Sequence, residues 1–158
     1  MPTPVKVLLI GCGVLLVLAI GGCFVFLAYV SNQPDAVEVS VDAPGQVTAG
    51  ESFRIVARVR NTGRGERELV DLDVADEYLE GIVITGTEPD HTDSMHVPID
   101  NTVSYSFGLP IPPDGEAVVV FEAHAAYAGD WAGDFDFCID SEVRCVSQHL
   151  RTLVTPAP

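Results

Sequence analysis

The stretch Ser52-Phe53-Arg54-Ile55-Val56-Ala57-Arg58-Val59-Arg60 alternates between apolar and basic residues with a period of two. Successive side chains of an extended strand point to opposite faces of a sheet. One face of this strand would carry Phe53, Ile55, Ala57 and Val59, and the other Arg54, Arg58 and Arg60. The stretch therefore predicts a β-strand that is half buried in a core.

Similar alternation recurs through most of the chain and predicts an all-β domain. It is clearest over 37–42, 70–74 and 103–107, where Val70, Leu72 and Val74 would point inward. The run 117–126 is almost continuously apolar, which predicts a central strand buried on most of both faces. Seven or eight short strands separated by turns describe an immunoglobulin-like β-sandwich over residues 37–154. We expect an irregular loop over 86–99, no helix within the domain, and a loose tail over 155–158.

The N-terminal part of the chain is uncharged between Lys6 and residue 31. As a helix, residues 7–30 would extend about 36 Å, enough to cross a hydrocarbon core of about 30 Å. The sequence therefore predicts a short inner segment (1–6), one transmembrane helix (7–30) and a linker (31–36). Lys6 and the amino terminus favour an inside N-terminus, which places the domain outside the cell membrane as a single-pass protein.

An alternative for this segment is a lipoprotein signal, because Ile20-Gly21-Gly22-Cys23 resembles a bacterial lipobox. Cys23 would then be lipidated. Residues 24–30 continue the apolar run beyond the cysteine, which favours the retained helix.

The charge of the chain is strongly asymmetric. All 23 acidic residues follow the apolar segment, and the net charge is −15. Nucleic acid and anionic lipid headgroups are therefore poor partners for the domain, and no nucleic-acid partner is expected.

Cys138 and Cys145 are the two cysteines outside the apolar segment, and six residues separate them. This spacing suits a tight hairpin, and an outer compartment would allow oxidation, so we expect a Cys138–Cys145 disulfide. A zinc site is the alternative, although the second half of a zinc signature is missing.

Several polar residues are candidates for binding. Asp90, His91 and His96 lie in the expected irregular loop, and they could form part of an interface or a weak metal site. Calcium is the more credible ion because it prefers oxygen ligands, and two acidic pairs offer them. These pairs are Asp71 with Asp73 and Asp134 with Asp136.

Structural explanations compete with each of these candidates. Asp71 and Asp73 could form cross-strand pairs with the arginine row, and Asp134 and Asp136 could share a solvated face. Trp131, between glycines 129 and 133, could cap one end of the sandwich or contact a partner.

Three turn segments carry a family resemblance over roughly residues 37–154. They are Val47-Thr48-Ala49-Gly50-Glu51-Ser52-Phe53, Val59-Arg60-Asn61-Thr62-Gly63 and Ile111-Pro112-Pro113-Asp114-Gly115-Glu116-Ala117-Val118. Together they resemble the CARDB-type, cell-adhesion-related modules of bacterial and archaeal surface proteins. The resemblance implies an immunoglobulin-like fold and supplies no catalytic residues.

These observations predict a non-catalytic binding or scaffolding module outside the membrane, in contact with another envelope or membrane protein. No Gly-x-Ser-x-Gly motif is present, no enzyme activity is expected, and no cofactor is expected unless calcium binds. The alternatives are an accessory subunit of a membrane complex and a free surface module that binds glycan or calcium.

Overall fold

The computed structural model describes residues 17–28 and 34–158, which belong to two compact units divided after residue 33. Residues 17–28 are helical, and Cys23 within them is exposed and has a free thiol. The remaining predicted membrane residues, 7–16 and 29–30, lie outside the described residues, as do 1–6 and 31–33. Within the described ranges, no helix has both the length and the apolar character needed to cross a membrane.

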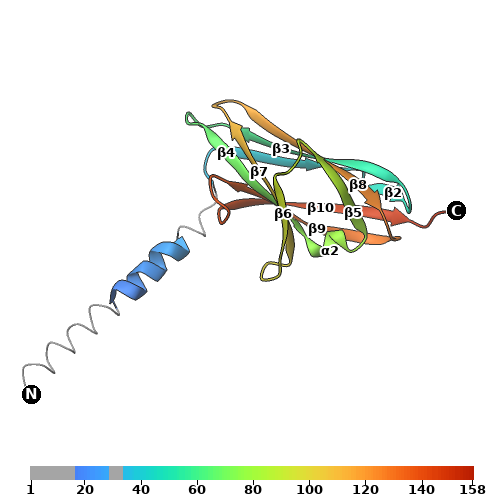
Figure 1. Ribbon diagram of the computed structural model, residues 1–158, viewed down its shortest axis with the longest axis horizontal. Coiled ribbons are helices and arrows are strands. Elements are labelled where there is room, and N and C mark those ends of the chain that lie inside the picture. Colours follow the sequence, from blue (N-terminus) through green and yellow to red (C-terminus); the bar gives the residue numbers. More distant parts are fainter. Residues whose placement is uncertain (1–16, 29–33) are drawn as a thin grey trace, which may run out of the picture. The chain divides into compact units, whose positions relative to one another are not determined.

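The second unit, residues 34–158, consists of ten strands and one short helix (Figure 1). In chain order they are β1 (Val37–Asp42), β2 (Gln46–Thr48), β3 (Ser52–Asn61), β4 (Arg67–Ala75), α2 (Asp76–Leu79), β5 (Ile82–Glu88), β6 (Asp93–Val97), β7 (Thr102–Ile111), β8 (Glu116–Ala125), β9 (Gly129–Ile139) and β10 (Cys145–Thr155).

The strands form two sheets. One sheet has the order β1-β3-β8-β5, and the other has the order β2-β10-β9-β4-β7-β6. The β2–β10 pair is parallel, and the other strand pairs are antiparallel. The fold is therefore the two-layered all-β sandwich that the alternating sequence predicted.

The core lies between the sheets and is built from their alternate residues. Phe121 of β8 contacts Tyr105 and Phe107 of β7 and Phe135 of β9, with ring centroids 5.4–6.4 Å apart in edge-to-face geometry. Such aromatic pairs add about 0.5–1.5 kcal/mol each beyond their area burial. Because every second side chain of a strand points into the core, the side chains between them form the outer faces of the sandwich.

Asn61 closes β3 from a fully buried position, within the Asn61-Thr62-Gly63 turn. Its side-chain amide donates to the carbonyls of Gly65 and Ile111 at 2.7 and 3.0 Å. Its side-chain oxygen accepts from the Gly63 amide at 2.9 Å. This turn therefore fixes the connection between the two sheets.

Some details differ from the predictions. The expected irregular loop 86–99 contains strand β6 and the end of β5. β6 is an edge strand whose residues are nearly all exposed, so it lacks the apolar alternation that would have indicated a strand. The four-residue helix α2 was also not predicted, and it is too short to show a helical period.

Two predicted side-chain orientations and one predicted pairing were also wrong. β8 is buried on one face only, with Val118 38% exposed. A bulge in β4 places Leu69 rather than Val70 in the core with Leu72 and Val74. Finally, the arginine row pairs within its own sheet, as in Arg54 with Glu122 at 2.8 Å, because β3 and β4 belong to different sheets.

Candidate functional site

An acidic pocket lies on the outer face of the six-stranded sheet, and we call it the acidic pocket throughout. Its volume is about 350 Å³. Of the ten described residues that line it, none is basic. Five are acidic: Asp71, Asp73, Asp93, Asp100 and Glu142.

Strand register assembles the floor of this pocket from distant parts of the chain. Asp73 of β4 lies opposite Asp136 of β9 on one side and Ser104 of β7 on the other. Asp71, two residues earlier on the same face, lies opposite Cys138 and Ser106. The β4 strand is therefore flanked by polar outer residues from both neighbours.

The aspartates of this face differ in burial, since Asp71 is buried while Asp73 and Asp136 are half-buried. Asp71 is only 5% exposed and makes none of the side-chain hydrogen bonds or ion pairs found within residues 34–158. Oδ1 of Asp73 and Oδ1 of Asp136 are buried and have no hydrogen-bond partner. Unpaired buried charges cost folding free energy, so this face is not optimised for stability.

Burial raises the pKa of Asp73 from its usual 3.8 to about 6. The side chain of Ser104 acts in the opposite direction, because it stabilises the charged form. Repulsion from the carboxylates of Asp71, Asp136 and Asp100 adds to the rise in the pKa. The Asp73 carboxyl therefore titrates close to neutral pH.

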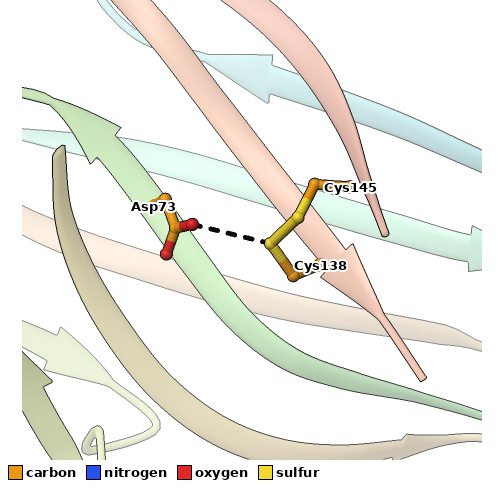
Figure 2. A group of neighbouring side chains, drawn as sticks. All are labelled: Asp73, Cys138 and Cys145. Carbon is orange, nitrogen blue, oxygen red and sulfur yellow. Dashed lines mark hydrogen bonds between the residues drawn. A yellow bond between two sulfur atoms is a disulfide. The ribbon is translucent and has the colours of Figure 1, made fainter. Parts of the chain in front are cut away.

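The predicted disulfide forms next to Asp73, one of the residues that line the pocket (Figure 2). Cys138 of β9 and Cys145 of β10 are directly opposite each other, with Cα atoms 4.0 Å apart. Asp73 points toward the bridge, with its Oδ2 atom 3.6 Å from Cys138 Sγ. A disulfide sulfur carries no proton, so a hydrogen bond here requires a protonated Asp73 as donor. The bridge holds the 138–145 hairpin, which supplies Glu142 and Val143 to the pocket wall.

The structure separates the four aspartates that were predicted as calcium ligands. Asp71 and Asp73 line the pocket, and Asp136 lies beside Asp73 on the neighbouring strand but is not among the lining residues. Asp134 is on the same outer face of β9, but its carboxylate is paired with His149 Nδ1 at 2.8 Å. Sequence alone could not have chosen these three, because Asp136 is 63 residues from Asp73.

The predicted histidine and aspartate group of the 86–99 region does not converge on one site. His91 Nδ1 lies 2.9 Å from the Thr87 hydroxyl, and its ring meets the edge of Tyr105. His96 Nε2 instead lies 2.7 Å from Asp76 Oδ2. Asp90 is exposed. Their role in an interface stays a prediction.

Trp131 is partly buried against the core rather than free at the surface. Its ring covers Gly81 and Gly129, where an added Cβ would lie 1.9 Å and 2.8 Å from the indole. Its indole nitrogen donates to the Tyr127 carbonyl at 2.8 Å. This packing agrees with the capping alternative, and a partner contact through Trp131 remains a prediction.

One serine–histidine pair has no signal in the sequence, because its two residues are 72 positions apart. Ser52 Oγ of β3 lies 3.5 Å from His124 Nδ1 of β8, which is its direct cross-strand neighbour. That distance exceeds the 2.6–3.2 Å typical of an activated nucleophile. Within the described residues, no carboxylate is bonded to the His124 ring, so the pair lacks the orienting acid of a triad.

Sequence reasoning also missed the contributions of Ser104, Ser106, Asp100 and Glu142 to the pocket. Alternation along 103–107 would have placed the two serines outward, but it could not have shown which strand lies beside them. Asp100 and Glu142 lie in turns, for which strand periodicity gives no signal.

The chain matches no protein-family model and no curated protein sequence. Solved structures, however, resemble it over most of its length. A cohesin module from a family 33 glycoside hydrolase of Clostridium perfringens has a TM-score of 0.50 at 10% identity, covering 77% of this chain and 98% of that one. AvmM, which catalyses macrocyclization in alchivemycin A biosynthesis, has a TM-score of 0.50 at 10% identity over 79% and 92%.

A CARDB domain from Pyrococcus furiosus, solved in complex with di-metal ions, is also similar. It has a TM-score of 0.49 at 14% identity, over 77% of this chain and 94% of that one. The two-sheet β-sandwich that the sequence predicted is confirmed by the strand order of the chain itself. At these identities the likeness shows the fold alone, so any function has to be argued from the chain's own site.

Proposed function

We propose that this chain is a non-catalytic binding module held at the outer face of a cell membrane by residues 7–30. The acidic pocket would be its contact surface for another envelope protein. The observation that carries the binding role is Asp71, a carboxylate that is 5% exposed and has no side-chain partner among residues 34–158, next to the half-buried Asp73 in a pocket lined by five acidic residues. Proteins tend to keep such destabilising arrangements at functional sites, where a partner compensates the charge.

The membrane tether is supported by the sequence, since residues 7–30 are uncharged and long enough to span as a helix. The tether favours a fixed partner in the same envelope, because attachment to one membrane raises the effective concentration of the two proteins. An accessory subunit of a membrane complex is one form of this function. A free surface module that binds glycan or calcium is the alternative, and the calcium form would use the same carboxylates.

The test uses the full-length protein in its native membrane, with a photo-crosslinking amino acid at position 143 or at position 118. Val143 is 46% exposed in the pocket wall, and Val118 is 38% exposed on the outer face of the opposite sheet. We expect the chain to resist carbonate extraction and to crosslink one envelope protein from position 143 only. Release by carbonate would contradict the tether, and equal crosslinking from both positions would contradict the pocket as the contact surface.

A further inference from the structure

The ligand of the acidic pocket has to supply positive charge and hydrogen-bond donors. The floor holds Asp71, which is 5% exposed and has no side-chain partner among residues 34–158, and Asp73, whose Oδ1 is buried without a hydrogen-bond partner. No basic side chain is among the described lining residues to neutralise them. A cation in the pocket would therefore offset the negative charge of several lining carboxylates at once.

The geometry disfavours a single bound ion. Calcium ligands lie at 2.3–2.6 Å, so their oxygen atoms lie within about 5 Å of one another. Among the described residues, the one group of three or more possible ligand atoms within 4.8 Å of one another is Asp73 with Cys138 and Cys145. The two sulfurs of that group are bonded to each other and are not thiolates, the form in which cysteine binds metals. The aspartates of the floor are thus spread more widely than a compact ion site requires.

A planar, extended cation suits this spread. The guanidinium group of arginine carries five donors in a fixed plane and can bind more than one carboxylate. The pocket volume of about 350 Å³ is also far larger than that of one water, about 30 Å³.

The walls of the pocket add an apolar component. Met95 and Val97 of β6 and Val143 of the hairpin line it, and Met95 is 64% exposed. Long basic side chains bury their methylene stems against apolar surface while the charged group reaches a polar site. We propose that the acidic pocket binds an arginine side chain of a protein partner. This rests on the proposed function, because it names the ligand chemistry of the same pocket.

The test is a titration of the isotope-labelled full-length protein in mild detergent, followed through its backbone amide signals. The probes are N-acetyl-arginine amide and N-acetyl-citrulline amide, which has nearly the same shape without the charge. We expect saturable shifts with the arginine probe near Asp71, Ser104 and Val143, and none with the citrulline probe. Equal shifts with both probes, or arginine shifts elsewhere on the domain, would overturn the proposal.

Two substitutions locate the binding groups. Asp71→Asn and Asp73→Asn keep side-chain volume and both residues line the pocket, so each should raise the dissociation constant of the arginine probe about fivefold or more, because a charge-assisted bond is lost. Asp134→Asn is the matched control, since Asp134 is on the same face but is paired with His149. It should change the constant less than about twofold. Equal effects of all three substitutions would show only a general loss of charge and would overturn the proposal.

A calcium chloride titration separates the competing ligand. If calcium gave saturable shifts at the same amides and displaced the arginine probe, the pocket would be an ion site and the proposal would be wrong. Failure of the arginine probe with the position-143 crosslink intact would remove the ligand assignment but keep the proposed function. Arginine binding without the crosslink would keep the ligand assignment but contradict the pocket as the contact surface for an envelope protein.

Discussion

Asp73 of β4 lies directly opposite Asp136 of β9, and each carries a buried Oδ1 atom without a hydrogen-bond partner. Like charges directly opposite each other in a sheet are destabilising. This pair therefore places a local cost on the outer face of the six-stranded sheet, beside the acidic pocket.

Asp73→Asn should stabilise the protein at neutral pH. Because the folded-state pKa of Asp73 is raised from 3.8 to about 6, its contribution to stability is present below pH 3.8 and is lost as pH rises through 6. With allowance for its partial exposure to solvent, the gain should be about 1–2 kcal/mol at pH 7.5. Urea unfolding at several pH values measures it.

The matched comparison for this prediction is the difference in the free energy of unfolding between wild type and Asp73→Asn, measured at each pH. That difference should shrink between pH 7.5 and pH 4 as Asp73 becomes protonated among its neighbours Asp71, Asp136 and Asp100. A difference that stayed constant over this range would show that the carboxyl of Asp73 is not the titrating group.

Replacing both disulfide cysteines, Cys138→Ala with Cys145→Ala, should lower the free energy of unfolding by about 2–3 kcal/mol. The chain-entropy model gives this size for a loop of eight residues. Thermal unfolding of the oxidised protein and the double variant measures the loss. Because the bridge holds the hairpin that carries Val143, the double variant should also bind the arginine probe more weakly than the oxidised protein. An unchanged free energy of unfolding would contradict a structural role for the bridge.

Gly81→Ala should destabilise the fold strongly, by about 2–4 kcal/mol, because the new methyl would lie 1.9 Å from the Trp131 ring. Gly86→Ala is the control, since nothing lies within 4 Å of the corresponding Cβ position. Tryptophan fluorescence during denaturation reports both effects, because Trp131 is the sole tryptophan. Similar stability of the two variants would mean that Trp131 does not cap this end of the sandwich.

Asn61→Ala should lower stability by about 2–3 kcal/mol. It removes three hydrogen bonds and leaves the buried Ile111 carbonyl without the amide donor. Thr62→Ala, in the same turn but exposed, serves as the control and should change stability by less than about 0.5 kcal/mol. Chemical denaturation distinguishes the two, and an equal loss in both variants would locate the effect in the turn backbone instead.

The sequence could predict the features of the fold that depend on local pattern. Alternation with period two predicted most of the strands and the outward direction of Asp71 and Asp73, because side-chain direction in a regular strand follows from position. The bulge in β4, which replaces Val70 by Leu69 in the core, breaks that rule. The spacing of Cys138 and Cys145 gave their disulfide, because it too is a local pattern. Ten strands are present instead of seven or eight, because β2 and β6 were missed along with α2; a three-residue strand, an exposed edge strand and a single helical turn show no hydrophobic period.

The tertiary structure alone decided what the acidic residues form. Asp71 and Asp73 were expected to pair with the arginine row, but β3 and β4 lie in different sheets, and the arginines pair with acids of their own sheet. Register instead set Asp136 beside Asp73 and left Asp134 to His149. Pairing between strands far apart in the chain is set by the packing of the whole core. The pattern of a single strand therefore predicts on which face of the sheet each aspartate lies, but it does not predict which residues lie beside it.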